Sequence, residues 1–141
     1  MKLVYVINGP NLNMLGKREP HIYGATTLDE IEANLRALAG ELGVASQFFQ
    51  SNHEGEIVQQ LHRAFEDGAA VIINPAGFSY HSVPIYDAIK MVKEPVIEVH
   101  ITNTHKRGGV YSHSIMSEVV TGVICGLGVR GYELALRTIA G

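Results

Sequence analysis

The sequence predicts an α/β protein, a three-layer sandwich in which helices cover both faces of a five-stranded parallel sheet. Short apolar runs such as Leu3–Ile7 alternate along the chain with amphipathic segments of helical period. Strands that are buried on both faces consist of such runs, and strands that alternate with helices form parallel sheets through right-handed crossovers. No linker or shift in composition interrupts the 141 residues, so we expect a single domain, residues 1–141.

The first strand, Leu3–Ile7, is followed by a long loop and then by a helix over Leu28–Leu42. Thr27 and Glu30 form a capping box at the start of this helix. Gly43 stops it, because glycine adopts the left-handed conformation that ends many helices.

The middle of the chain repeats the strand–helix unit twice. Val44–Gln50 reads as a second strand, and Asn52 is placed to cap a helix that reaches about Asp67. Ala69–Ile73 reads as the third strand, and Ser82 then caps the helix that follows it.

The last part of the chain supplies two more strands, Val96–Ile101 and Val119–Cys125, and a closing helix, Val129–Ala140. Five strands with this spacing favour a flavodoxin-like arrangement. The carboxyl ends of parallel strands meet at one edge of the sheet, where open α/β proteins bind their ligands. Residues at three predicted strand ends, Asn8, Asn74 and His100–Asn103, should therefore line one crevice.

The loop between the first strand and the first helix is the most informative segment. Connections in compact α/β domains usually take about 2–6 residues, and this one is roughly three times longer. It is rich in glycine and proline and carries Asn11, Arg18 and Tyr23. Its position after a parallel strand predicts a functional loop rather than a plain connection.

Composition excludes several functional classes. The formal net charge is −3 and basic residues are scattered, which argues against a nucleic-acid or membrane partner. No leader pattern and no apolar run of about 20 residues occurs. The single cysteine, Cys125, cannot form an internal disulfide, and its apolar neighbours suggest a buried structural thiol. We expect a cytoplasmic protein.

Two motif searches argue against a cofactor and a metal. Gly126-Leu-Gly128-Val-Arg-Gly131 matches a dinucleotide fingerprint, but no later strand can supply the acidic ribose ligand. We interpret these glycines as a tight turn and close packing. The seven histidines show no metal-binding pair on a helix and no second cysteine exists, so we expect no cofactor and no metal.

Two pairs of residues suggest acid–base chemistry. Glu98 and His100 are two residues apart on a predicted strand, so their side chains point to the same face. The carboxylate could orient the imidazole as a general acid. Alternatively, the two residues form a hydrogen-bonded pair in the core. The backbone amides of Ile101–Thr102 could cradle a carboxylate. The second pair is Tyr23 and Arg18. A phenol, with an ordinary pKa of about 10, is a poor base unless a nearby cation stabilises its phenolate, and Arg18 could supply that charge to Tyr23. On spacing alone this is a weak signal, because a tyrosine near an arginine is usually only a pair of surface residues.

The chain resembles the type II 3-dehydroquinate dehydratases over essentially its full length. The motifs that carry this resemblance occur in matching order and spacing. They are Asn8-Gly-Pro-Asn-Leu12, Arg18-Glu-Pro-His-Ile-Tyr-Gly24, Ile97-Glu-Val-His100 and Gly122-Val-Ile-Cys-Gly-Leu-Gly128 with Gly131-Tyr132. The resemblance implies a flavodoxin-like fold and a homododecamer assembled from trimers. It also implies a reaction without a cofactor on a small molecule: the anti elimination of water from 3-dehydroquinate to give 3-dehydroshikimate.

The resemblance also implies roles for individual residues. Tyr23 would remove the proton from C2 of the substrate, while Arg18 would stabilise the phenolate and close the lid. Asn11 would position a water against the enolate oxygen. His100 would protonate the departing C1 hydroxyl, and Glu98 would orient His100.

Other residues would bind the substrate. Asn74 and the backbone at Ile101 and Thr102 would hold its carboxylate end. Asp87 would lie near its hydroxyl end, close to a neighbouring subunit.

Two positions depart from the family pattern at the hydroxyl end. Tyr80 stands where the family places a substrate-contacting histidine, with His81 one place later, and Tyr111 stands where an arginine is usual. In one interpretation, the hydroxyl groups of the two tyrosines take over the hydrogen bonds of the usual residues and the protein is a working dehydroquinase. In a second, the same elimination acts on a related cyclic hydroxy-keto acid with different ring substituents. In a third interpretation, a register change brings His81 into the site.

A non-enzymatic role is the remaining alternative, because flavodoxin-like folds also serve as binding modules and switches. Such proteins need a phosphate-binding loop or an acidic cluster at the strand ends. The sequence contains neither.

Overall fold

The computed structural model describes all 141 residues and contains one parallel sheet with the strand order β2-β1-β3-β4-β5. This order is that of the flavodoxin-like fold, so the predicted fold class is confirmed. The strands are β1 (Leu3–Asn8), β2 (Ala45–Gln50), β3 (Ala70–Asn74), β4 (Val96–His100) and β5 (Gly122–Cys125).

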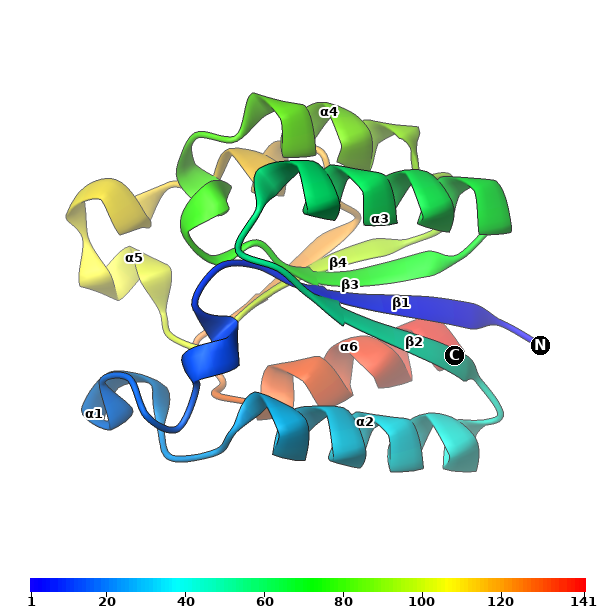
Figure 1. Ribbon diagram of the computed structural model, residues 1–141, viewed down its shortest axis with the longest axis horizontal. Coiled ribbons are helices and arrows are strands. Elements are labelled where there is room, and N and C mark those ends of the chain that lie inside the picture. The colour runs from blue at the N-terminus through cyan, green and yellow to red at the C-terminus, as the bar shows by residue number, and fades with distance from the viewer.

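Four long helices form the two outer layers of the sandwich. Helices α2 and α6 cover one face of the sheet, and α3 and α4 cover the other (Figure 1). Their bounds are Leu28–Leu42 for α2, Glu54–Asp67 for α3, Val83–Met91 for α4 and Arg130–Ala140 for α6. None of them combines the length and the apolar composition that crossing a bilayer requires.

The core lies in two layers, one on each face of the sheet. In β1, Val4 and Val6 pack toward α2 and α6, while Tyr5 and Ile7 pack toward α3 and α4. Successive side chains of a strand point to opposite faces, so a strand with both faces covered is apolar throughout. This packing explains the continuous apolar run of β1.

Two predicted caps are confirmed. The Thr27 hydroxyl accepts a hydrogen bond from the Glu30 amide at 3.2 Å, and Gly43 ends α2 with φ of 70°. The Ser82 hydroxyl accepts from the Ile85 amide at 3.2 Å at the start of α4. The other element boundaries mostly agree with the structure within one residue.

Two sequence predictions about elements are wrong. Asn52 does not cap α3, which begins at Glu54 with His53 at its N-cap. The fifth strand begins at Gly122 rather than Val119, because Ile115–Glu118 forms a 3₁₀ helix, η4, that Val119 closes. The apolar run continues across this boundary, so hydrophobicity alone does not mark it.

The glycines of the apparent dinucleotide motif serve the turn and the packing that we predicted. Gly126 has φ of 86°, and a Cβ there would lie 2.9 Å from the Cβ of Asn103. Gly131 packs against Val99 and Ile124, where β5 meets α6.

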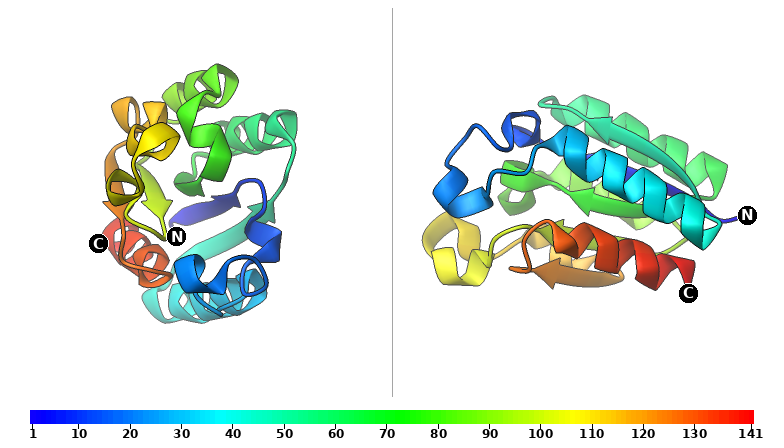
Figure 2. Two further views of the ribbon diagram at one scale, coloured as in Figure 1. Left: turned by 90° about the vertical axis from the view of Figure 1, so that its left-hand side faces the viewer. Right: turned by 90° about the horizontal axis from the view of Figure 1, so that it is seen from below.

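The short elements gather at the carboxyl ends of the strands. Two single-turn helices, α1 (Pro20–Tyr23) and α5 (Thr104–Arg107), lie at this end of the molecule and face the viewer in the left panel of Figure 2. The 3₁₀ helices here are η1 (Leu12–Met14), η2 (Ala76–Tyr80) and η3 (Gly109–Ser112). Segments distant in sequence therefore share one end of the sheet.

Candidate active site

A cavity of about 220 Å³ opens at the carboxyl ends of β1, β3 and β4. Its wall is formed by the long loop after β1, by η2, and by the segment from the end of β4 to η3. The sequence-predicted residues that line it are Asn11, Arg18, Tyr23, Asn74, Tyr80, His100, Ile101, Thr102 and Tyr111.

Three residues of the predicted site do not line this cavity, and neither do Asn8 and Asn103, which the sequence placed at the same crevice. Glu98 is fully buried beside His100, and Asp87 lies exposed on α4. His81 is exposed and packs edge-on against the ring of Phe78, while Tyr80 takes the place at the cavity wall. The interpretation in which His81 enters the site is therefore wrong for this structure.

The floor of the cavity holds a buried acid–imidazole pair. Glu98 and His100 are two residues apart on β4, and the Glu98 Oε2 lies 2.5 Å from the His100 Nε2. His100 is buried, with only 6% of its surface exposed. Because Nε2 is engaged with Glu98, Nδ1 is the nitrogen that remains to address a ligand.

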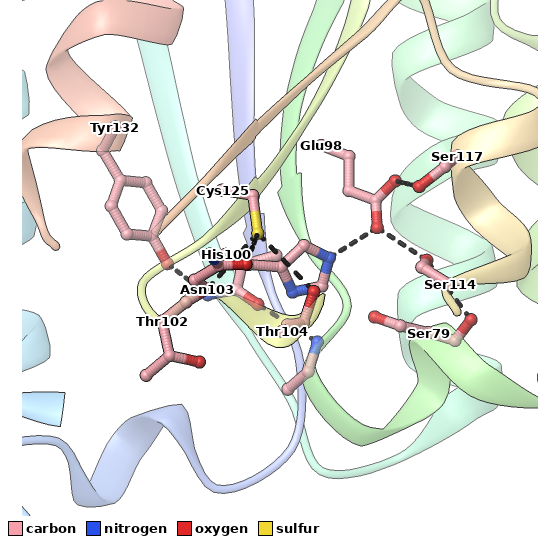
Figure 3. Close-up of polar contacts among 12 residues, drawn as sticks. Ser79, Glu98, His100, Thr102, Asn103, Thr104, Ser114, Ser117, Cys125 and Tyr132 are labelled. Atoms are coloured by element: carbon pink, nitrogen blue, oxygen red, sulfur yellow. Dashed lines mark hydrogen bonds and ion pairs between the residues drawn. The ribbon is translucent and has the colours of Figure 1, made fainter. Parts of the chain in front are cut away.

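Two serines complete the environment of Glu98 (Figure 3). The Ser114 hydroxyl donates to Oε2 at 2.6 Å, and the Ser117 hydroxyl donates to Oε1 at 2.8 Å. Burial alone would raise the pKa of Glu98, but the hydrogen bonds and charge of His100 and the two hydroxyls together lower it below its ordinary value. Glu98 is thus held as a carboxylate that fixes the imidazole.

This lowered pKa predicts a pH-dependent stability. A carboxyl whose folded-state pKa is depressed stabilises the fold above its unfolded value, here about 4.5, and loses that contribution as the pH falls through the folded value. We expect the stability difference between the wild type and Glu98→Gln to be largest near neutral pH and to shrink as the pH falls below about 4.5. Urea unfolding at stepwise pH measures it.

A matched control is Glu41→Gln, which neutralises an exposed carboxyl on α2. Its stability difference from the wild type should stay nearly constant over the same pH range. A constant difference for Glu98→Gln would contradict the assigned ionisation of Glu98.

The phenol ring of Tyr23, on the long loop after β1, lies near two guanidinium groups. The Arg18 Cζ lies 5.0 Å from the centroid of the Tyr23 ring, and the Arg107 Cζ lies 5.5 Å from the same centroid. Tyr23 is half-buried at the cavity wall, and Arg18 is exposed. The pairing of Tyr23 with Arg18 was predicted from the sequence, whereas Arg107 was missed because it comes from α5, far along the chain.

The start of this loop is held by a hydrogen bond to Asn52, which the sequence had placed at the start of α3. Asn11 has a left-handed backbone with φ of 69°, and its amide donates to the Asn52 Oδ1 at 2.9 Å. Gln50, at the end of β2, donates from Nε2 to the same oxygen at 3.2 Å. Asn52 therefore holds Asn11 at the cavity instead of capping α3.

A buried polar chain supports the inner wall. The Asn74 Nδ2 donates to the Tyr132 hydroxyl at 3.0 Å, and that hydroxyl donates to the Asn8 Oδ1 at 2.6 Å. Burial raises the pKa of the Tyr132 phenol, so it remains a donor. The sequence showed Tyr132 only as part of a motif, and its hydroxyl could have been suspected because a buried phenol needs a polar partner.

The turn after β4 offers free backbone donors. The amides of Ile101 and Thr102 donate to no other group of the chain, and both residues line the cavity. The Cys125 Sγ lies 3.4 Å from the carbonyl of Thr102 and 3.5 Å from the hydroxyl of Thr104 (Figure 3). Cys125 is half-buried rather than buried as we expected, because β5 is an edge strand.

The two departing tyrosines form one aromatic wall. The ring centroids of Tyr80 and Tyr111 lie 5.6 Å apart with an angle of 86° between the planes. Burial raises the pKa of the Tyr80 phenol above its ordinary value, against the opposing charge of Arg107. Tyr80 therefore presents a neutral hydroxyl, which can donate or accept a hydrogen bond.

The assembled groups can perform proton transfer at two points of one bound molecule. A phenol close to two cations and an imidazole fixed by a carboxylate line the same cavity. Free amides beside them can bind an anionic group. No group of three or more histidine, cysteine, aspartate or glutamate side chains is placed to hold a metal ion.

Comparison with protein families gives a match over nearly the whole chain, to the family that the sequence motifs resemble. The family model described as dehydroquinase class II matches residues 2–140. Curated 3-dehydroquinate dehydratases from Brucella canis and Brucella suis are 52% identical over 139 residues, which cover 99% of this chain and 88% of each relative.

Solved structures agree with the computed one. The type II dehydroquinase from Propionibacterium acnes matches with a TM-score of 0.97 at 44% identity, covering 99% of this chain and 97% of that one. The enzyme from Butyrivibrio crossotus also gives 0.97, at 34% identity, covering 99% and 98%. A 3-dehydroquinate dehydratase-like protein from Bifidobacterium longum gives 0.75 at 32% identity, covering 99% and 96%.

Proposed function

The chain belongs to the class II dehydroquinase family, and from this premise we propose how it dehydrates 3-dehydroquinate to 3-dehydroshikimate. The observation that carries the proposal is one cavity lined both by Tyr23, which lies close to two guanidinium groups, and by His100, which is held by the buried Glu98 carboxylate. The reaction is an anti elimination that needs one base and one acid.

The base is Tyr23 in its phenolate form. The guanidinium groups of Arg18 and Arg107 lie 5.0 Å and 5.5 Å from the centroid of the Tyr23 ring, and cations close to a phenol favour its ionised form. The phenolate takes the proton from C2, and the electrons of the C–H bond form an enolate with the neighbouring ketone. Asn11 positions a water that donates a hydrogen bond to the enolate oxygen.

The acid is His100. It donates a proton to the C1 hydroxyl, which leaves as water while the enolate electrons form the new carbon–carbon double bond. Glu98 keeps the imidazole oriented through the 2.5 Å contact at Nε2. The free amides of Ile101 and Thr102, together with Asn74, bind the substrate carboxylate beside the acid.

At the hydroxyl end of the substrate, Tyr80 and Tyr111 replace the groups expected from the family pattern. Of the interpretations that the sequence leaves open, the half-buried neutral phenol of Tyr80 favours simple replacement by another hydrogen-bonding group. The alternative, elimination from a related cyclic hydroxy-keto acid, requires that 3-dehydroquinate be a poor substrate.

We expect Tyr80→His to keep or improve kcat/KM for 3-dehydroquinate, because it restores a hydrogen-bonding imidazole at the same place. Tyr80→Phe should raise KM by about tenfold, since it leaves a substrate hydroxyl without its partner. Steady-state kinetics of the two variants checks this. An unchanged KM in Tyr80→Phe would show that the hydroxyl of Tyr80 does not address the substrate.

The test of the proposed function is a direct assay with 3-dehydroquinate that follows the ultraviolet absorbance of the conjugated product. We expect turnover by the purified protein without added metal or cofactor. If the folded protein gives no turnover, the proposed substrate is wrong, and elimination from a related acid becomes the explanation to test next.

Assembly and domain organisation are also proposals. We infer that residues 1–141 act as one domain and that the chain forms a homododecamer of trimers, in which Asp87 reaches the site of a neighbouring subunit. The exposure of Asp87 on α4, outside the cavity of its own chain, is compatible with that role. Light scattering on the purified protein measures the assembly directly.

A further inference from the structure

Within its own chain, the Arg107 guanidinium is held by aromatic rings and not by an ion pair. Its Cζ lies 3.9 Å from the centroid of the Tyr111 ring and 5.5 Å from that of Tyr23. No carboxylate forms a salt bridge with it, and its guanidinium makes no hydrogen bond to the chain. The shorter of the two ring contacts is the one with Tyr111, so this ring is the main partner that fixes the guanidinium.

The backbone brings Tyr111 to this place by a sharp turn. Gly108 and Gly109 follow α5 with φ of 71° and 57°, conformations that residues with a Cβ rarely adopt. The Tyr111 amide then donates to the carbonyl of Gly108 at 3.2 Å, which folds η3 back against α5. The Tyr80 ring also packs against the Tyr111 ring, in an edge-to-face contact.

We propose that Tyr111 is a positioning residue, whose ring holds the Arg107 guanidinium over Tyr23 and so supports the phenolate that removes the substrate proton. This inference rests on the proposed function of Tyr23, and it replaces the expected role of Tyr111 as a hydroxyl group for the substrate. The face of a tyrosine ring attracts a guanidinium through its quadrupole, and the hydroxyl is not needed for that attraction. The ring and the hydroxyl can therefore be tested separately.

The charged and titratable groups that face Tyr23 around the cavity are Arg18, Arg107, Tyr80, His100 and Tyr111. Arg18 also lies over the Tyr23 ring, but it comes from the same loop and is exposed to solvent. Arg107 is half-buried, so its charge is screened less. If Arg107 no longer lies over the ring, a higher pH should therefore be needed to form the Tyr23 phenolate.

The central comparison is Tyr111→Leu against Tyr111→Phe. Leucine removes the ring, so we expect the acidic limb of the pH profile of kcat/KM to move to higher pH and the value at neutral pH to fall by about threefold to tenfold. Phenylalanine keeps the ring, and its acidic limb should coincide with that of the wild type. A shift in both variants, or in neither, would overturn the proposal.

A matched control removes a ring from under a cation elsewhere in the chain. Tyr86 on α4 lies beneath Lys90, with 5.7 Å from Nζ to the ring centroid, and does not line the cavity. Tyr86→Leu should leave the pH profile unchanged. Thermal unfolding of all variants separates a folding defect from the expected effect.

A double-mutant cycle tests the route through Arg107. In an Arg107→Leu background, Tyr111→Leu should cause no further shift of the acidic limb, because the cation that it positions is already absent. A full additional shift would show that Tyr111 acts by another route and would overturn the proposal.

A measurement without substrate separates this inference from the proposed function. The pH titration of the Tyr23 ring, followed by NMR of ¹³C-labelled tyrosine and assigned with Tyr23→Phe, should move to higher pH in Tyr111→Leu but not in Tyr111→Phe. This result would stand even if the protein did not turn over 3-dehydroquinate. Turnover with an unmoved titration in Tyr111→Leu would refute the role of Tyr111 alone.

Discussion

The variant Tyr23→Phe is expected to lose about 10²- to 10⁴-fold in kcat for 3-dehydroquinate, the range typical of a missing general acid or base. The substitution removes only the hydroxyl oxygen that accepts the C2 proton. The ring remains, so the contacts of Arg18 and Arg107 with its face should persist. Steady-state kinetics with 3-dehydroquinate measures the loss.

The binding of the substrate should change much less than its turnover in this variant. A ligand competition assay should give nearly the same affinity for Tyr23→Phe as for the wild type. Tyr86→Phe makes the same chemical change outside the cavity and should keep wild-type kinetics. If Tyr23→Phe retained activity, another group would have to be the base.

The second large effect is expected at His100. His100→Ala should lower kcat by about 10²- to 10⁴-fold, because no other side chain on the cavity floor can protonate the leaving hydroxyl. The variant should also lose stability, by about 1–3 kcal/mol, since it removes one hydrogen-bond partner of the buried Glu98 carboxylate.

The double variant His100→Ala/Glu98→Gln separates these two consequences. Glutamine removes the uncompensated charge, so much of the lost stability should return, as measured by urea unfolding. The activity should not return, because the proton donor is still missing. Recovery of both would mean that His100 serves the fold rather than the reaction.

Much of the fold followed from the sequence because its determinants are local. The apolar strands, the cap of α2 at Thr27 and the glycine that ends it each depend on neighbouring residues, and the structure agrees with them. The start of β5 was misplaced because its apolar run extends into η4, where the chain turns without a change in hydrophobicity.

The site was only partly predictable, for a physical reason. Convergence at the strand ends follows from parallel topology, so Asn74 and His100 could be assigned to one crevice before the structure was known. Arg107, Asn52 and Ser114 lie in a single-turn helix and in connections that are too short to show a periodic pattern, and their contacts join residues distant in sequence. Such contacts leave no pattern in a single chain.

The two residues that differ from the family pattern also show that contacts between distant residues cannot be predicted from a single sequence. The sequence showed that Tyr80 and Tyr111 replace other residue types, but not that their rings pack together. It also could not show that the Arg107 guanidinium lies on the Tyr111 ring. From this contact we propose that Tyr111 supports a cation, in place of its expected role as a substrate contact.

The most direct measurement uses two samples of 3-dehydroquinate, each with deuterium at one of the two hydrogen positions of C2. The central claim is that Tyr23 and His100 act on opposite faces of the substrate ring. We predict that the protein removes only the hydrogen that is anti to the C1 hydroxyl, so mass spectrometry finds deuterium retained in one product and lost from the other. Loss of the syn hydrogen would contradict the assignment of these two residues.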